Sequence, residues 1–193
     1  MCISEACFVR YCSPTLAGLK TANLFSCSVE SSEALRKTIG ELNQALSPKG
    51  IRVVSLRYRR GCALIYSYRP DCLERDLKNE CACRLLQKCG YSSTNPECCL
   101  SRLIDRLASQ EDFPHEIGLF LGYPPEDVSG FIEHGARDYK CSGKWKVYGD
   151  EERARKIFEK YNICTKILCA QHAQGKPLDR LTVAVGAEER SRA

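Results

Sequence analysis

The chain has 193 residues, which is long enough to bury a hydrophobic core without support from metal ions or disulfides. Hydrophobic residues make up 44% and charged residues 27%, a balance that is typical of globular proteins and excludes a largely disordered chain. Lysine and arginine outnumber aspartate and glutamate by 29 to 24, an excess too small to indicate nucleic-acid binding by charge alone.

The expected cellular location follows from two patterns that the sequence lacks. Residues 1–30 contain no charged start followed by an apolar run and a small-residue cleavage site. No stretch approaches the ~20 apolar residues that span a bilayer. We therefore expect a cytoplasmic protein without membrane contact. The fourteen cysteines would then be reduced thiols, as in an anaerobe or another strongly reducing cell.

The first elements are predicted from apolar spacing and from residues that begin or end helices. A short helix is expected over residues 2–12, ending before Pro14, because proline disfavours helical geometry in the residue before it. Residues 20–28 have the pattern of a short strand. An amphipathic helix follows Ser31 and Ser32, which are both good N-caps.

The next segment, residues 51–69, predicts a β-hairpin. Apolar and polar residues alternate on both sides of a turn at Gly61. Strict alternation places Val54, Leu56 and Tyr58 on one face of the first strand.

The second half of the chain predicts mainly helices, followed by a short strand region. Prolines, glycines and asparagine caps mark helical segments that begin near Pro70, residue 81, Pro96, Phe113 and Tyr123. Residues 139–148 suit one or two strands, and Asp150 caps a last long helix. Because strands and helices do not alternate strictly, we predict an α+β fold with a small, mostly antiparallel sheet packed with several helices.

The domain organisation is predicted from where the apolar pattern stops. Residues 1–174 are expected to form a single α+β domain. After Gly175 the pattern fades, which predicts a flexible C-terminal tail over residues 175–193.

The cysteine spacings do not favour a metal site. No Cys-x-x-Cys pair occurs, and the nearest groups, Cys81 with Cys83 and Cys98 with Cys99, would point apart on a helix. We predict no metal site, and we interpret most of the cysteines as small buried hydrophobic residues.

Residues 12–20 offer groups that could receive an anion. Cys12 opens the segment, Thr15 supplies a hydroxyl, Gly18 permits close approach and Lys20 supplies a charge. The spacing of a phosphate-binding loop is absent, so a purely structural turn is the alternative interpretation.

Residues 141–148 form the second candidate segment and contain the only tryptophan. Trp145 lies between two lysines, and Cys141 and Tyr148 flank them. An aromatic ring beside basic side chains can stack on a ligand ring and hold its phosphate. The alternative is an amphipathic strand whose tryptophan faces the core. His115, near a predicted helix start, is a third candidate, with a structural role as its alternative.

These segments resemble an uncharacterised family of bacterial proteins of unknown function that is common in clostridia-like anaerobes. The resemblance is carried by residues 12–25 (CSPTLAGLKTANLF), 113–132 (FPHEIGLFLGYPPEDVSGFI) and 141–148 (CSGKWKVY), and it extends over about residues 5–172. It implies no catalytic residue and no particular cofactor.

Our first functional hypothesis is a protein that binds a small ligand or cofactor, as an accessory to iron or redox metabolism in an anaerobe, with a redox protein as a further partner. It requires residues 12–20, 113–123 and 141–148 to converge on one cleft. The proposed ligand-binding residues are Thr15, Lys20, Cys141, Trp145 and Tyr148.

Two further hypotheses come from other functional classes. One is an enzyme in which Cys12 is the nucleophile and Lys20 or His115 lowers the pKa of its thiol, which requires Cys12 to be exposed. The other is an interaction module that binds an acidic partner or RNA through one exposed patch, although the charge pattern favours plain solvated strands over nucleic acid. The residues of that patch would be Arg52, Arg57, Arg59 and Arg69.

Overall fold

The computed structural model describes residues 3–109 and 112–184, which include helices together with a three-stranded and a two-stranded antiparallel sheet. This confirms the predicted α+β class. The chain divides into two compact units, unit 1 with residues 1–70 and 163–193, and unit 2 with residues 71–162. The single domain predicted over residues 1–174 stays a prediction.

Unit 1 is built on the larger sheet. Its strands are β1 (Ala22–Ser28), β2 (Arg52–Arg59) and β3 (Cys62–Tyr68), in the order β1-β3-β2 with both pairs antiparallel. Strands β2 and β3 form the predicted hairpin. Two residues of the turn between them, Arg60 and Gly61, have positive φ.

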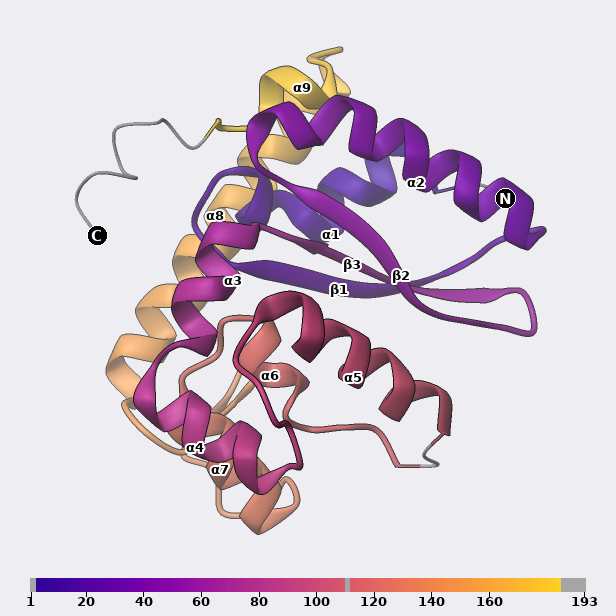
Figure 1. Cartoon of the computed structure of the whole chain (residues 1–193). Helices are drawn as coiled ribbons and strands as arrows, with labels where there is room; N and C mark the ends of the chain where they lie inside the picture. The colour runs from indigo at the N-terminus through magenta and orange to yellow at the C-terminus, as the bar shows by residue number, and fades with distance from the viewer. Residues whose placement is uncertain (1–2, 110–111, 185–193) are drawn as a thin grey trace. The chain divides into compact units, whose positions relative to one another are not determined.

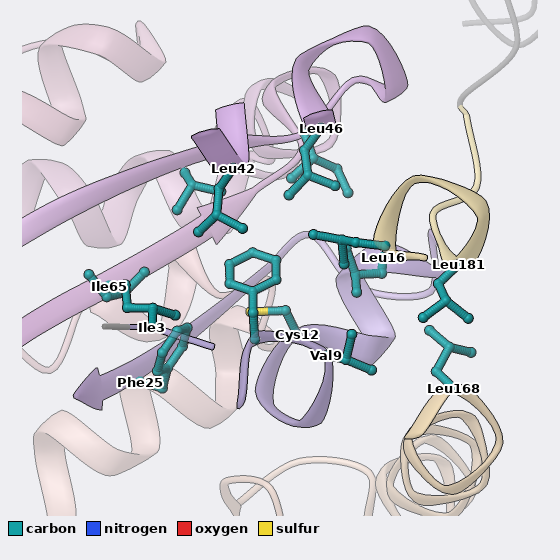
Figure 2. Close-up of a cluster of buried hydrophobic side chains, with 14 of the residues drawn as sticks. Ile3, Val9, Cys12, Leu16, Phe25, Leu42, Leu46, Ile65, Leu168 and Leu181 are labelled. Atoms are coloured by element: carbon teal, nitrogen blue, oxygen red, sulfur yellow. The ribbon is translucent and has the colours of Figure 1, made fainter. Parts of the chain in front are cut away.

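The helices α1 (Glu5–Leu16) and α2 (Ser32–Leu46) cover one face of this sheet (Figure 1). Their apolar side chains meet Phe25 and Ile65 of the sheet in a continuous core (Figure 2). Part of α8 (Glu151–Ala173) and the short α9 (Leu178–Leu181) complete this core with Cys164, Leu168, Leu178 and Leu181. A 3-10 turn, η1 (Ser47–Lys49), joins α2 to β2.

Two local predictions for unit 1 were wrong. Helix α1 does not end before Pro14 but continues to Leu16, because Pro14 lies in the last turn, where losing one N–H donor breaks only one bond of the ladder. The ladder continues beyond the proline, where Ala17 N donates to Ser13 O at 2.9 Å. The register of β2 against β3 shifts between Ser55 and Arg57, which is a β-bulge at Leu56.

The bulge changes which residues of β2 are buried. Val53 and Leu56 are buried, whereas Val54 is half-buried and Tyr58 is exposed. The expected common face of Val54, Leu56 and Tyr58 therefore does not exist. The edge of β2 is covered by Asn43 of α2, whose side chain exchanges hydrogen bonds of 2.8 Å with both backbone groups of Val53.

Unit 2 contains short helices and the smaller sheet. Its elements are α3 (Pro70–Leu77), α4 (Glu80–Lys88), α5 (Pro96–Ser109), α6 (Ile117–Phe120), α7 (Pro125–His134), β4 (Cys141–Ser142), β5 (Lys146–Val147) and the first part of α8. Each helix follows one of the predicted starts, within a few residues.

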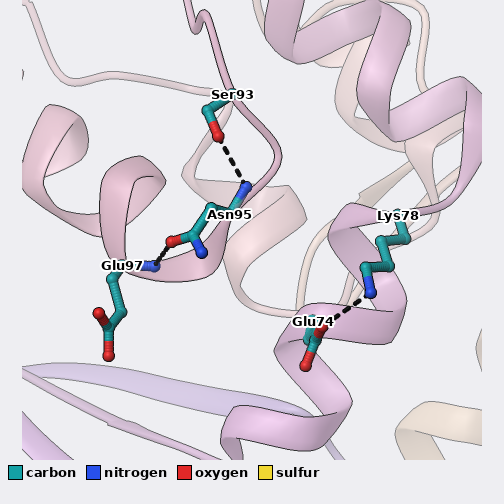
Figure 3. Close-up of polar contacts among 5 residues, drawn as sticks. All are labelled: Glu74, Lys78, Ser93, Asn95 and Glu97. Atoms are coloured by element: carbon teal, nitrogen blue, oxygen red, sulfur yellow. Dashed lines mark hydrogen bonds and ion pairs between the residues drawn. The ribbon is translucent and has the colours of Figure 1, made fainter.

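Side-chain caps fix several of these helix starts. The carboxamide of Asn95 accepts from Glu97 N at 3.0 Å, and Ser93 Oγ accepts from Asn95 N at 3.0 Å (Figure 3). Directly after α3, Lys78 Nζ pairs with Glu74 Oε1 of that helix at 2.7 Å (Figure 3). The cap at Asn95 fixes where α5 begins.

Residues beyond the end of the apolar sequence pattern still pack against the core of unit 1. Leu178 and Leu181 of α9 are buried in the core of unit 1, and Val183 N donates to Leu16 O at 2.9 Å. This packing extends past the boundary predicted at residue 174. The part of the predicted tail at residues 185–193 lies outside the described residues. Within the described ranges, no helix is both long enough and apolar enough to cross a membrane.

Candidate ligand-binding cleft

Unit 2 contains a half-open cleft of about 410 Å³. Its walls come from three stretches: the residues before and within α6, helix α7, and the β4–β5 turn. Rings dominate the walls, and two lysines from the turn complete them. The ring-bearing residues of the lining are Phe113, His115, Tyr123, Phe131 and Trp145.

Asp127 holds one wall of the cleft in place through three hydrogen bonds. It is 3% exposed, and its Oδ2 accepts a hydrogen bond from Trp145 Nε1 at 2.7 Å. Its Oδ1 accepts from the backbone N–H groups of Tyr148 at 2.7 Å and Gly149 at 2.8 Å. A buried carboxylate is tolerated when donors satisfy it in this way. Asp127 therefore fixes both the orientation of the tryptophan and the path of the chain after β5.

The rings of the cleft hold one another in place. Tyr123 stacks on Trp145 with centroids 4.7 Å apart and an interplanar angle of 28°, and Phe158 packs against Trp145 at 80°. On the other wall His115 meets Phe131 edge to face at 4.8 Å. Burial raises the pKa of the Tyr123 phenol to about 12, with a smaller contribution from nearby Tyr161, so Tyr123 is neutral at physiological pH.

Two glycines allow these close contacts. A Cβ at Gly118 would lie 2.7 Å from Val128 Cγ2, and one at Gly143 would overlap the ring of Phe158. Neither glycine has a positive φ, so the requirement is one of space and not of backbone conformation.

A buried polar cluster supports the segment that carries His115. The next residue, Glu116, is 2% exposed, accepts from Tyr91 Oη at 3.0 Å and pairs with Arg106 Nε at 3.0 Å. Arg106 also donates to Cys89 O. Burial and the adjacent Glu116 carboxylate raise the pKa of Tyr91 far above its usual value. Because Glu116 points inward to this cluster, the exposed neighbouring His115 is left on the cleft side.

The structure brings together two of the three segments predicted to converge. Residues 113–123 and 141–148 both line the cleft, and His115 and Trp145 are the predicted residues that reach it. Cys141 is buried in a small core with Val147 and Phe158. Tyr148 contributes its backbone N–H to Asp127, and its ring stacks on His134 at 5.7 Å.

Residues 12–20 belong to unit 1 and are engaged in its interior. Cys12 has no exposed surface (Figure 2), and burial raises the pKa of its thiol well above the usual value. Thr15 is also fully buried and donates from Oγ1 to Asn23 Oδ1 at 2.7 Å, while Lys20 is 8% exposed. The exposed thiol that a Cys12 nucleophile requires is therefore not present in this structure.

Arg69 does not belong to an exposed basic patch. It is 1% exposed, and its guanidinium donates to the carbonyls of Thr15, Leu16, Lys49 and Val183 at 2.8, 3.0, 3.3 and 2.8 Å. The hypothesis that Arg69 belongs to an exposed patch was therefore wrong. A guanidinium can be buried where backbone carbonyls accept its hydrogen bonds. Arg52, Arg57 and Arg59 are exposed, as that hypothesis expected.

The cysteines divide by burial. Cys12, Cys99, Cys141 and Cys164 are buried, as the interpretation of small hydrophobic residues expects. Of the thirteen described cysteines only these four are buried, six are half-buried, and Cys62, Cys81 and Cys98 are exposed. The interpretation that most of the cysteines are buried was therefore wrong. In the described part of the chain, no three His, Cys, Asp or Glu side chains gather as they would around a metal ion.

The sequence pattern missed Asp127, Glu116 and Arg106. An acidic residue in the first turn of a helix is ordinarily explained by the helix dipole, so Asp127 carried no separate signal. Glu116 and Arg106 pair across ten residues and a change of element, which no local periodicity encodes.

Fold and cleft together define an α+β protein with a ring-lined cavity bounded by lysines. The sequence profile of one protein family, described as protein of unknown function (DUF3793), matches residues 8–182. The chain belongs to this family, which confirms the predicted membership of a family of unknown function. No curated protein and no solved structure is significantly similar to the chain.

Proposed function

We propose that this protein binds a small molecule in the cleft of unit 2. The observation that carries the proposal is a concave site of about 410 Å³ whose walls are rings from three separate stretches of chain. Ligand sites of proteins are mostly apolar clefts of roughly 300–1,000 Å³ with a few placed polar groups. The cleft meets both conditions, with Asp127 and two lysines as its charged groups.

Two titratable groups of the cleft, Asp127 and Tyr123, serve its structure, which favours binding over catalysis by these two residues. Asp127 already accepts three hydrogen bonds, and Tyr123 is held neutral by its raised pKa. A carboxylate that already accepts from three donors is a poor general base, because its lone pairs are directed to those donors. Cys12, the proposed nucleophile, is buried in unit 1.

The single tryptophan makes this proposal directly testable. Because Trp145 lines the cleft, its emission reports occupancy without a label. The probes are adenosine, riboflavin and the monophosphate of each, followed by Trp145 fluorescence and, independently, by equilibrium dialysis. We expect saturable binding of at least one probe at micromolar to millimolar concentration.

Matched variants locate the binding. Phe113→Ala removes an exposed ring of the cleft wall and should weaken binding by about tenfold, since ring stacking contributes roughly 1–3 kcal/mol. Ile132→Ala removes a comparably exposed apolar side chain of α7 that does not line the cleft, and should leave affinity unchanged. Absence of saturable binding of all four probes, or equal weakening by both variants, would contradict the proposal.

A narrower form of this proposal assigns the protein to iron or redox metabolism of an anaerobe, together with a redox partner protein. It is supported by the exposed thiols of Cys62, Cys81 and Cys98, which resist oxidation only in a reducing compartment. Anaerobic purification followed by an absorption spectrum and metal analysis tests it. A colourless protein whose thiols are already oxidised in its native cell would count against this narrower form.

A further inference from the structure

We propose that the ligand of this cleft is a planar aromatic molecule carrying a phosphate or a similar anionic group. Its ring would lie against the aromatic walls, and its anion would lie at Lys144 and Lys146. This inference rests on the function proposed above and specifies the chemical class of the ligand.

The β4–β5 turn and the first residue of β5 place two lysines at the cleft. Lys144 is exposed and Lys146 is half-buried, and both line the cleft. Lys146 Nζ lies 3.7 Å from the ring centroid of Tyr139, which supports the cation without neutralising it. Across residues 3–109 and 112–184, no acidic side chain pairs with either lysine. A ligand anion would supply the missing counter-charge.

The negative charge of the cleft is held by hydrogen bonds within the protein. Among the described lining residues, Asp127 is the only acid, and both of its oxygens already accept hydrogen bonds from Trp145, Tyr148 and Gly149. Its charge is satisfied by those three donors. Two lysines of the lining thus face one carboxylate whose oxygens are already engaged by hydrogen bonds.

The walls of the cleft suit a planar ring in both shape and chemistry. Phe113, Phe131 and Trp145 offer ring surfaces, and stacking of a base on an aromatic side chain is worth roughly 1–3 kcal/mol. A purely aliphatic ligand would gain less from these walls and nothing from the lysines. A cleft of about 410 Å³ fits one ring system with its substituent, which favours a free molecule over a polymer.

The decisive comparison uses pairs of probes that share a ring and differ by one phosphate, adenosine with adenosine monophosphate and riboflavin with flavin mononucleotide. Affinities are measured by Trp145 fluorescence and dialysis, as above. In at least one pair the phosphorylated member should bind about tenfold more tightly, which corresponds to ~1.4 kcal/mol. Its advantage should shrink as the salt concentration rises, because exposed lysines are screened.

Charge variants locate the anion. The double variant Lys144→Gln with Lys146→Gln should abolish the preference for phosphate while retaining affinity for the neutral probe. Lys88→Gln with Lys160→Gln removes two exposed lysines of unit 2 that do not line the cleft, and should retain the preference. If the first double variant does not fold, the single variant Lys144→Gln and the salt dependence of the unaltered protein give the same test.

The outcomes separate this inference from the function on which it rests. Equal binding of both members of each pair would overturn the anionic ligand and leave the binding cleft in place. No binding of any probe would overturn the proposed function itself. An oligoadenylate that binds far more tightly than adenosine monophosphate would overturn the assignment of a small free ligand.

Discussion

Residues 12–20 of unit 1 and residues 141–148 of unit 2 both combine cysteine, hydroxyl groups, glycine and lysine, yet they lie in opposite surroundings. In the first, Cys12 and Thr15 are fully buried beneath helices and a sheet. In the second, Lys144 is exposed and Trp145 lines a cleft. The same residue types therefore contribute to core packing when a sheet and helices bury them. They can contact a ligand when they lie on a short two-stranded turn that leaves them exposed to solvent.

The largest expected effect concerns the buried segment, residues 12–20, which Arg69 contacts. Arg69→Met removes the guanidinium that serves four backbone carbonyls, including those of Thr15 and Leu16. Because a hydrogen bond from a charged donor is worth about 1.5–3 kcal/mol, the free energy of unfolding should fall by about 3 kcal/mol or more. Urea denaturation followed by circular dichroism measures the loss.

The control for this prediction is Arg52→Met, which removes an exposed arginine from the same sheet and should cost less than about 0.5 kcal/mol. A similar loss in both variants would show that Arg69 is not a structural anchor. The same experiment tests the single-domain prediction, because Trp145 fluorescence reports unit 2 alone. Coincident transitions by both signals indicate one cooperative unit, and separated transitions indicate two.

The next largest effect concerns the segment at the cleft, residues 141–148, which Asp127 contacts. Asp127→Ala leaves three donors without their acceptor and should lower the stability of unit 2 by about 2 kcal/mol or more. The emission of Trp145 should move to longer wavelength as its indole loses its partner. Asp127→Asn should cost less, since its amide oxygen can still serve the two backbone N–H groups.

Asp150→Ala is the matched control for Asp127. Asp150 caps α8 by accepting from Arg153 N at 3.0 Å, and its loss should cost about 1 kcal/mol without changing the emission of Trp145. Unchanged emission in both Asp127 variants would mean that the carboxylate does not position the indole.

The smallest effect concerns Cys12. Cys12→Ala removes one buried atom from the core of unit 1 and should cost about 1 kcal/mol. In the native protein, iodoacetamide should alkylate the exposed Cys98 and spare Cys12, because burial removes access and raises the pKa of the Cys12 thiol. Mass spectrometry of the labelled peptides reads out both sites. Alkylation of Cys12 as fast as Cys98 would restore the nucleophile hypothesis.

Much of the fold was predictable because its signals are local. Ser31 caps α2 by accepting from Ala34 N at 3.1 Å, and Asn95 caps α5, as their sequence positions indicated. The bulge at Leu56 was not predictable, because it arises from how β2 pairs with β3 and leaves no mark on the alternation itself. The continuation of α1 beyond Pro14 was not predicted either. It is possible because the residues after the proline still donate backbone hydrogen bonds to the preceding turn.

The candidate site was predictable only in part. The sequence singled out His115 and Trp145 by residue type, and both reach the cleft. It could not supply Asp127, whose bonds span 18 to 22 residues, or separate the buried Lys20 from the exposed Lys144. Burial of a polar side chain is decided by tertiary packing, which spacing along one chain does not express.

Gly118 and Gly143 bear on how a protein of this kind could acquire a new ligand during evolution. A side chain at either position would collide with Val128 or Phe158, so the frame of the cavity tolerates almost no substitution there. Phe113 and Lys144, in contrast, can be exchanged without repacking, since both are exposed. A lineage that changes its preferred ligand would therefore do so by substituting such outer residues around an unaltered frame.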